Sequence, residues 1–490
     1  MTTVFNAFQR SATTHAAQPF LEFPSRQVRF TYGETLERVH DIAKRYRARG
    51  YGPGHRVALQ LETCPEFLLH FLALNSISAS VVPVNPDYRE AELRYVLEHS
   101  EAALVVTKAN LDDPAPAPHP GNARECALLY TSGTTGKPKG CLLSNFYFLY
   151  VGQRYLDEGE LCAVRQGDRL ITPLPLFHMN ALAVSTTAMI LSGGCIVQLD
   201  RFHPRTWWRD VAESAATIVH YLGVMPAVLL SLPEESNEKA HRVRFGYGAN
   251  ANPKDHAAFE ARFGFPLIEA WAMTETGGGA LVAASREPRH VGTRCIGFPK
   301  EDLHVKIAED GELLVRQTGS DPRRGFFSGY LKDEKSTVEV WRDGWFHTGD
   351  EVRRGPDGAL HFVDRLKNII RRAGENIAAL EVEAALAGHP AIAQVAVIAV
   401  PDPVRDEEVM ACVVPTPGST RSRETALAIQ DWCLERLAYF KAPGHVAFVD
   451  SLPITATNKV QKAKLADFAL RASDSYDLRD RKKRTAAKSV

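Results

Sequence analysis

The sequence predicts an α/β fold with parallel sheets, and three observations indicate it. Short apolar runs, each long enough for one buried strand, alternate with helical patterns through most of the chain. The chain has 490 residues, of which 45% are hydrophobic and 24% charged, as expected for a folded protein of several domains. The texture changes near Asp364, after which a compact unit restarts. This change predicts a second, smaller α+β domain.

The first strand is predicted at 56–61, where polar and apolar side chains alternate, and a helix at 66–75. Apolar runs bounded by helical or turn-forming segments predict the later strands of the large domain. These runs are 80–84, 103–107, 169–172, 195–199, 217–221 and 266–271.

The second domain is predicted to begin near Lys367, which divides the chain into 1–366 and 367–490. A helical pattern at 380–386 stops at Gly388-His389-Pro390, a helix-ending sequence. Strands are expected at 395–400 and 410–415, and a helix at 426–437.

The overall charge excludes some function classes. Lys plus Arg and Asp plus Glu both number 58, so no net field attracts nucleic acid or a membrane surface. The eight cysteines form no CxxC pair, which argues against a zinc site or a disulfide framework and fits a reducing cytoplasm. No signal peptide or membrane-spanning run is visible, so we expect no integral membrane association. The basic tail at 481–484 is expected to be solvated.

A loop rich in glycine and hydroxyl groups follows the apolar run 127–130 and suits a polyphosphate. Backbone N–H groups, hydroxyls and a lysine can gather there around phosphate oxygens. Its residues are Thr131, Ser132, Gly133, Thr134, Thr135, Gly136 and Lys137. It is not a P-loop, because Thr131 stands where that motif has its first glycine and Pro138 where it has Ser or Thr.

Further motifs follow in a fixed order. Trp271-Ala272-Met273-Thr274-Glu275, Thr348-Gly349-Asp350, 362–368, 371–376 and 452–462 occur along the chain in that sequence. Together with the phosphate loop they resemble the adenylate-forming superfamily of acyl-CoA synthetases, adenylation domains and firefly luciferase. The resemblance implies a large N-terminal domain of layered α/β sheets with a β-barrel-like subdomain, and a small mobile C-terminal domain. It also implies ATP, Mg²⁺ and coenzyme A as cofactors.

The resemblance assigns roles to the nucleotide site. Thr274 would bind a phosphate oxygen, and Glu275 would bind Mg²⁺ together with Thr131. Gly246, Tyr247 and Gly248 would flank adenine, Trp271 would stack on it, Asp350 would bind both ribose hydroxyls and Arg365 would reach ribose or phosphate.

The resemblance also assigns the moving parts. Lys459 would be the catalytic lysine, Lys367 the hinge and Gly374 a wall of the pantetheine tunnel. His178 would contact the substrate carboxylate or act as a gate, although a packed loop histidine explains it equally well.

The chain departs from the family pattern at three positions. Trp271 replaces a tyrosine, Ala272 replaces a glycine, and Asn458 stands where a glycine usually precedes the catalytic lysine. An indole still offers a face for stacking, and Asn tolerates left-handed backbone angles.

The resemblance implies an ATP-dependent acid–CoA ligase that makes an acyl-adenylate and then a thioester, releasing AMP and pyrophosphate. The Gly374-Glu375-Asn376 sequence resembles that of the crotonobetaine/carnitine-CoA ligase branch. Three alternatives remain at this stage: an enzyme loading a carrier protein, a luciferase-like oxygenase and a non-catalytic nucleotide-binding protein. The acid itself is not fixed, and neither is the choice between monomer and homodimer. Candidate pocket residues are His178, Met179, Tyr221, Gly223, Gly248 and Gly277-Gly278-Gly279, whereas Trp207 and Trp208 are expected to be structural.

Overall fold

The computed structural model describes residues 2–131, 137–365, 369–453, 462, 465 and 474–483. These residues belong to two compact units. The larger unit contains 1–85, 97–130 and 140–364, and the smaller contains 86–96, 131–139 and 365–490.

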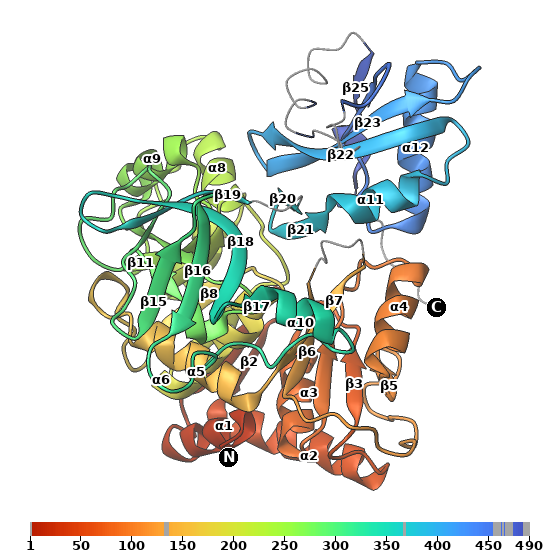
Figure 1. The fold of residues 1–490 in the computed structure, drawn as a ribbon. Coiled ribbons are helices and arrows are strands. Elements are labelled where there is room, and N and C mark those ends of the chain that lie inside the picture. Colours follow the sequence, from red (N-terminus) through yellow and green to blue (C-terminus); the bar gives the residue numbers. More distant parts are fainter. Residues whose placement is uncertain are drawn as a thin grey trace. The chain divides into compact units, whose positions relative to one another are not determined.

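Mostly parallel sheets form the α/β layers of the larger unit (Figure 1). One has the order β5-β3-β4-β6-β7, and the other has the order β13-β12-β11-β10-β8-β9-β1-β2. In the second sheet, β12, β11, β10, β8 and β9 run parallel, so their carboxyl ends share one edge. The strands are β1 Pro19–Phe23, β2 Val28–Thr31, β3 Arg56–Leu59, β4 Ser80–Pro83, β5 Leu104–Val106, β6 Ala127–Thr131, β7 Lys139–Leu143, β8 Arg169–Thr172, β9 Cys195–Gln198, β10 Ile218–Leu222, β11 Phe245–Ala249, β12 Leu267–Trp271 and β13 Val282–Ala283.

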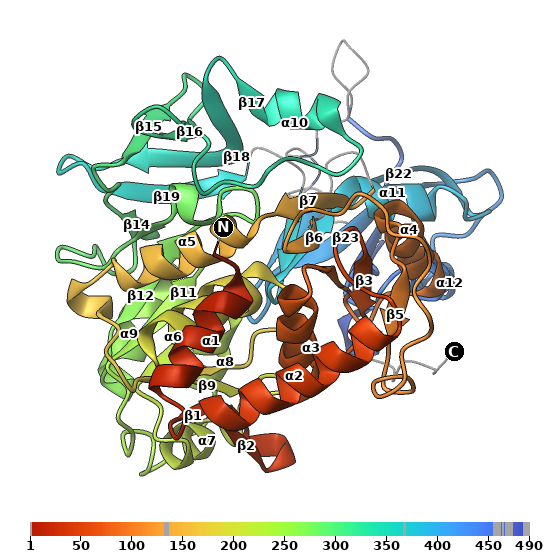
Figure 2. The same ribbon diagram turned by 90° about the horizontal axis from the view of Figure 1, so that it is seen from below.

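Helices cover both faces of the longer sheet because its side chains alternate between two apolar cores. Leu170 and Ile196 belong to one core, and their neighbours Ile171 and Val197 belong to the other. Helices α1, α2, α3, α5 and α6 contribute to the first core (Figure 2), and α7, α8 and α9 contribute to the second. The α-helices up to residue 340 are α1 Val4–Thr14, α2 Tyr32–Ala48, α3 Pro65–Ser76, α4 Glu90–Ser100, α5 Asn145–Leu156, α6 Thr186–Ser192, α7 Trp207–Glu213, α8 Val224–Ser231, α9 Pro253–Phe263 and α10 Glu334–Val340.

An antiparallel sheet completes the larger unit. Its order is β14-β19-β18-β16-β15, with β17 paired to β18. Strands β14 and β15 are therefore its edges, whereas the resemblance implied a β-barrel-like subdomain. Leu313 and Phe346 of this sheet belong to the same core as α5 and α6. Its strands are β14 Cys295–Gly297, β15 Leu303–Ile307, β16 Glu312–Gln317, β17 Trp341–Arg342, β18 Trp345–Arg354 and β19 Leu360–Arg365.

The smaller unit has its own sheet and core. The order is β21-β20-β23-β24-β25, with β22 paired to β23, and helices α11 and α12 pack on it. Its elements are β20 Ile369–Arg372, β21 Glu375–Ala378, α11 Ala379–Leu386, β22 Ile392–Asp402, β23 Asp406–Pro415, α12 Arg423–Arg436, β24 His445–Phe448 and β25 Ser475–Asp477.

The predicted α/β class is confirmed, and each strand or helix predicted above overlaps an observed one of the same type. The strand expected at 395–400 extends over Ile392–Asp402, because it pairs along its length with β23. The prediction missed α2, although Thr31 and Glu34 form a capping box that signals its start. Among the described residues, no helix combines the length and hydropathy needed to cross a bilayer.

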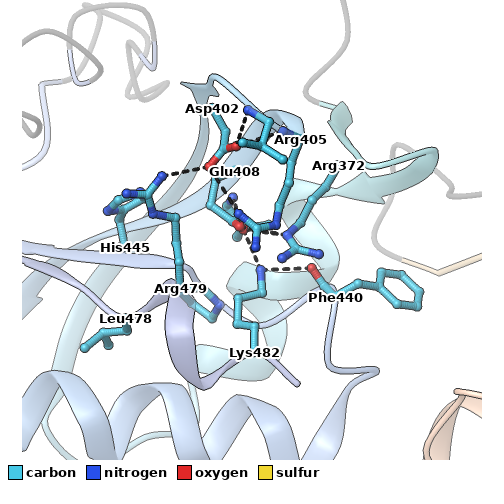
Figure 3. Close-up of polar contacts among 12 residues, drawn as sticks. Arg372, Asp402, Arg405, Glu408, Phe440, His445, Leu478, Arg479 and Lys482 are labelled. Carbon is cyan, nitrogen blue, oxygen red and sulfur yellow. Dashed lines mark hydrogen bonds and ion pairs between the residues drawn. The ribbon is translucent and has the colours of Figure 1, made fainter. Parts of the chain in front are cut away.

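The basic tail at 481–484 was expected to be solvated, and Arg481 and Lys483 are indeed exposed, but Lys482 is buried. Strand β25 pairs antiparallel with β24, and Leu478 is 1% exposed in the core of the smaller unit. The Lys482 side chain is fully buried, and its Nζ donates to Glu408 Oε1 at 2.5 Å and to the Phe440 carbonyl at 3.1 Å (Figure 3). Lys482 was misjudged because its counterion Glu408 lies 74 residues away in the sequence.

Lys482 predicts a pH dependence of stability. Burial, and secondly the Arg372 guanidinium, lower the pKa of Lys482 to about 7, against the attraction of Glu408. Because the folded pKa lies below the ordinary value of 10.5, the unfolded chain binds this proton more tightly. The free energy of unfolding should therefore rise between pH 7 and pH 10.5, with a slope of at most about 1.4 kcal/mol per pH unit from this group.

The check is thermal unfolding of the wild type and Lys482→Met at pH 7 and pH 9. We expect the midpoint of the wild type, relative to that of the variant, to be higher at the higher pH. Methionine fills similar space and leaves Glu408 paired with Arg372, whose Nε lies 2.8 Å from Glu408 Oε2. A difference that stays constant or falls with pH would show that Lys482 is charged throughout.

Candidate active site

Asp350 is held in a fixed position on β18 by the residues just before it. Gly349 has a φ of +68°, a left-handed angle that glycine adopts without strain. Its N–H donates to Glu312 Oε1 at 2.8 Å. Thr348 Oγ1 donates to the Leu313 carbonyl at 2.7 Å and accepts from the Asp350 N–H at 3.0 Å. The Thr-Gly-Asp sequence therefore orients a carboxylate that is only 1% exposed.

Trp271 and Asp350, two residues that the sequence predicted separately, are in contact. Trp271 ends β12, and its indole Nε1–H donates to Asp350 Oδ2 at 2.9 Å in a buried setting. A carboxylate has about four acceptor positions, so this bond orients Asp350 and still permits others. The substitution of Trp for the family's Tyr thus brings a donor that reaches the predicted ribose ligand.

Thr274 and Glu275 lie in the turn after β12 and are held by two tyrosines. The Tyr147 hydroxyl donates to the Thr274 carbonyl at 2.8 Å, and the Tyr330 hydroxyl donates to Glu275 Oε1 at 2.9 Å. Burial, followed by the charge of Glu275, raises the pKa of Tyr330, so this hydroxyl stays protonated. Neither tyrosine belongs to a motif, and no sequence signal identified them.

The three glycines after Glu275 serve close packing and not an open space. A Cβ at Gly277 would lie 2.2 Å from the Tyr147 ring, and one at Gly279 would lie 2.2 Å from the Phe326 ring. Gly278 packs in the same way against the backbone of α5. These glycines were predicted as pocket candidates, but the space beside their Cα atoms is filled by protein atoms. They bring α5 close to the turn that carries Glu275.

The turn after β11 is held by Glu269 of β12. This buried carboxylate accepts the N–H groups of Asn250 at 2.9 Å and Ala251 at 3.0 Å, and the Tyr221 hydroxyl at 2.5 Å. Burial raises the pKa of Glu269. Gly248 on β11 packs closely against Tyr221 on β10. A Cβ at position 248 would lie 2.2 Å from the Tyr221 carbonyl oxygen, so a glycine is required there. The role of Glu269 was not recognised in the sequence, because its partners Asn250 and Ala251 lie 19 and 18 residues away.

The strand residues 246–248 have mixed roles. The Tyr247 ring is 2% exposed and packs on Tyr155, with ring centroids 4.3 Å apart. A Cβ at Gly246 would lie 2.7 Å from Leu267. Tyr247 is therefore a core residue by its side chain, and the adenine contact expected of Gly246, Tyr247 and Gly248 stays a prediction for their backbone.

His178 follows β8 and precedes a π-helical turn at Asn180–Ser185, a conformation frequent at functional sites. Its carbonyl accepts from the Leu182 N–H at 3.1 Å, and its half-buried ring lies against Phe177. The structure thus places His178 at the carboxyl end of a parallel strand, where ligands bind in open α/β sheets. Its contact with a substrate stays a prediction.

A buried histidine that the sequence did not single out lies on β10. His220 Nδ1 is 2.9 Å from Ser185 Oγ and 3.1 Å from Asn180 Oδ1, and its Nε2 is 3.0 Å from the Tyr155 hydroxyl. Burial lowers the pKa of His220 to about 3, so the ring is neutral. This network ties the π-helical turn to the sheet. Trp207 and Trp208 are buried on the opposite face, as expected for structural residues.

The remaining predicted residues belong to the smaller unit or lie outside the described residues. Thr131 ends β6, and Lys137 Nζ lies 5.4 Å from the centre of the Tyr95 ring. Gly374, with a φ of +92°, forms the tip of the β20–β21 hairpin with Ala373. The side chain of Arg365 is not among those described. Outside the described residues lie Ser132, Gly133, Thr134, Thr135, Gly136, Lys367 and Lys459.

Comparison with known families identifies the class of protein. The model of the AMP-binding enzyme family matches 8–125 and 112–321, and that of the AMP-binding enzyme C-terminal domain matches 381–459. The chain belongs to the AMP-binding enzyme family and, within it, to the AMP-forming acid–thiol ligases. The resemblance predicted from the motifs is thereby confirmed.

Individual relatives support this assignment. The chain is 30% identical to a crotonobetaine/carnitine–CoA ligase of Proteus mirabilis over an alignment 491 positions long. The alignment covers 89% of this chain and 93% of the relative. A malonyl-CoA ligase with methylmalonyl-CoA and AMP bound has a TM-score of 0.75 at 27% identity, covering 89% and 97% of the two chains. A double mutant of o-succinylbenzoate CoA synthetase from Bacillus subtilis, at 24% identity, shares the fold with a TM-score of 0.82 and coverage of 94% and 98%.

The Trp271–Asp350 contact makes a testable prediction about nucleotide binding. Trp271→Phe keeps an aromatic face but removes the donor to a buried carboxylate. A hydrogen bond to a charged group contributes about 1.5–3 kcal/mol, so we expect AMP to bind about tenfold or more weakly. Calorimetric titration with AMP measures this loss.

Trp345→Phe is the matched control, because Trp345 lies on the same strand and packs under Arg316 without bonding to Asp350. It should bind AMP like the wild type. Equal affinities for Trp271→Phe and the wild type would show that the indole N–H has no part in the site.

Proposed function

We propose that this protein is an ATP-dependent acid–CoA ligase that works in two steps. The observation that supports this most is the buried contact between Trp271 and Asp350 in a unit that also holds Glu275 against Tyr330. These are the residues to which the motifs assign adenine, ribose and phosphate contacts. The Asp350 carboxylate suits the hydroxyls of a sugar, and the Glu275 carboxylate suits a hard cation.

In the first step, an oxygen of the substrate carboxylate attacks the α-phosphorus of ATP. The new oxygen–phosphorus bond forms as the bond to the β-phosphate oxygen breaks, and pyrophosphate leaves. Asp350 would orient the ribose and Trp271 the adenine, while Lys459 and the loop at 131–137 neutralise the developing charge. Mg²⁺, held by Glu275 and Thr131, would supply further positive charge on the phosphates when bound.

In the second step, the thiol of coenzyme A attacks the acyl carbon, the carbon–oxygen bond to AMP breaks and the thioester forms. We propose that the domain 367–490 turns about Lys367 relative to 1–366 between the steps, which removes Lys459 and presents Gly374 to pantetheine. The acyl-adenylate is a mixed anhydride, so its pocket must exclude water. The eight cysteines are all buried and form no disulfide among the described residues, which supports a reducing compartment such as the cytoplasm.

The substrate is proposed to be a small organic acid. A betaine-type acid, suggested by the relatives' name, needs an aromatic or anionic cage for its trimethylammonium group. Trp207 and Trp208 cannot form that cage, since both are buried in the second core with Phe259 and Phe263.

In the test, the purified enzyme is given ATP, Mg²⁺ and coenzyme A together with one of four classes of acid: short, aromatic, dicarboxylic or betaine-type. We expect AMP, pyrophosphate and an acyl-CoA in equal amounts with at least one class. AMP and pyrophosphate formation that ends in a thioester only when a carrier protein is supplied would instead support the carrier-loading alternative. No AMP with any acid would contradict the proposed function.

A further inference from the structure

The segment 474–483 lies beyond the range that the C-terminal family model matches, which ends at 459. It is nevertheless built into the smaller unit through β25 and Leu478. Two of its side chains, Arg479 and Lys482, reach one end of the β22–β23 hairpin (Figure 3). We propose that Arg479 and Lys482 are positioning residues, which hold the hairpin tip of Ala373 and Gly374 in place for the thioester step.

The first tie runs from Arg479 to the turn between β22 and β23. Arg479 Nη1 donates to Asp402 Oδ2 at 2.8 Å, and its other nitrogens bind Asp477. Asp402 Oδ1 in turn accepts the N–H groups of Val404 at 2.9 Å and Arg405 at 2.8 Å. One carboxylate, 4% exposed as a residue, therefore joins the tail to the backbone of this turn.

The second tie runs from Lys482 to β23. The side chains of Lys482 and Glu408 are fully buried. Glu408 also accepts the Arg372 Nε–H, which lies 2.9 Å from Oε1 and 2.8 Å from Oε2. A Cβ at Gly444 would lie 2.5 Å from Glu408 Cδ, so Gly444 on the neighbouring segment makes room for this carboxylate. Glu408 is thus shared between the tail and the last residue before the Ala373-Gly374 tip.

The braced turn holds the tip directly. The Ala373 N–H donates to the Arg405 carbonyl at 2.9 Å, and the Arg371 N–H donates to Glu407 Oε2 at 2.6 Å. Ala373 and Gly374 have φ values of +48° and +92°, as in the tight two-residue hairpin turns that need two left-handed residues. The alanine is strained in that conformation, so its neighbours must maintain it. The order of contacts is tail, β22–β23 turn, tip.

This inference rests on the proposed function, because the tip matters to the reaction only where a pantetheine thiol passes it. A misplacement of about 1 Å can cost about a hundredfold in rate. Loosening the brace should therefore impair attack by the thiol and leave adenylation unchanged, since no nucleotide contact is assigned to the tail.

The experiment compares the full-length wild type with Arg479→Ala/Lys482→Met, in which both ties are cut. We expect kcat/KM for coenzyme A to fall at least about tenfold, with ATP–pyrophosphate exchange within about twofold of the wild type. Hydrogen exchange at the Ala373 amide should become faster in the variant. Arg479→Lys, which keeps a cation beside Asp402, should restore part of the loss when it replaces Arg479→Ala in the double variant.

Arg481→Ala is the matched control, because Arg481 comes from the same tail but pairs with Asp431 on α12 at 2.9 Å. It should leave both half-reactions unchanged. If the double variant does not fold, the single variant Lys482→Met replaces it in the test, since it leaves Glu408 paired with Arg372. We then expect a smaller fall in kcat/KM for coenzyme A.

Two results would overturn the proposal: unchanged kinetics with coenzyme A, or a proportional loss of both half-reactions with a lower unfolding temperature. The latter would make the tail merely structural. A wild type that forms no acyl-CoA would instead reject the proposed function and is distinct from both.

Discussion

Lys459→Ala should lower ATP–pyrophosphate exchange by about a hundredfold to a thousandfold. The reason is electrostatic: pyrophosphate departure spreads negative charge over phosphoryl oxygens, and a lysine there stabilises the transition state more than the bound substrates. Removal of one such donor typically costs about 3–4 kcal/mol of transition-state stabilisation. Under the proposed alternation Lys459 has withdrawn before the thiol attacks. A supplied acyl-adenylate should therefore still be converted to the thioester at close to the wild-type rate.

Lys462→Ala separates the role of Lys459 from a general loss of positive charge. Lys462 lies three positions further along, and its Nζ pairs with Glu383 Oε1 at 2.6 Å. We expect it to retain exchange activity close to that of the wild type. Loss of both half-reactions to the same extent in Lys459→Ala would contradict the assignment of this lysine to adenylation alone.

Glu275→Gln should cost about a hundredfold or more in adenylation and shift the half-saturating Mg²⁺ concentration upward. Glutamine keeps the shape of the side chain and can still accept from the Tyr330 hydroxyl, which lies 2.9 Å from Oε1. What it removes is the negative charge that a hard cation needs. The measurement is pyrophosphate exchange as a function of Mg²⁺ concentration.

Tyr330→Phe provides the comparison for Glu275→Gln. It removes the hydrogen bond to Glu275 and keeps the carboxylate, so we expect a loss of about tenfold with a smaller shift in the Mg²⁺ dependence. If Glu275→Gln had the Mg²⁺ dependence of the wild type, Glu275 would not be a metal ligand.

The sequence singled out candidate site residues of the larger unit but not the contacts between them. Trp271 and Asp350 were each recognised within a motif, but they are 79 positions apart, and only the folded sheets bring them within 2.9 Å. Tyr330, 55 positions from Glu275, belongs to no motif and could not be found in this way. Local chemistry such as the Thr348-Gly349-Asp350 turn is readable from the sequence, whereas partners from distant strands are not.

Glycines and charges were the main sources of error. The absence of a side chain at Gly277, Gly278 and Gly279 does not reveal what occupies the space, and here it is occupied by Tyr147, α5 and Phe326. Lys482 suggested solvation because the carboxylate that pairs with it is not close to it in the sequence. Glu408 precedes Lys482 by 74 positions, and Asp402 precedes its partner Arg479 by 77. Burying a cation requires such a partner, and a local pattern cannot show one.

The most direct test of the proposed chemistry follows an oxygen atom. A carboxylic acid that the enzyme accepts is labelled with ¹⁸O in its carboxylate and converted to the acyl-CoA with unlabelled ATP. Since the carboxylate oxygen that attacks phosphorus stays on phosphorus when the thiol displaces AMP, one ¹⁸O should appear in each AMP by mass spectrometry. AMP without label, or label found in inorganic phosphate together with ADP, would contradict an acyl-adenylate intermediate.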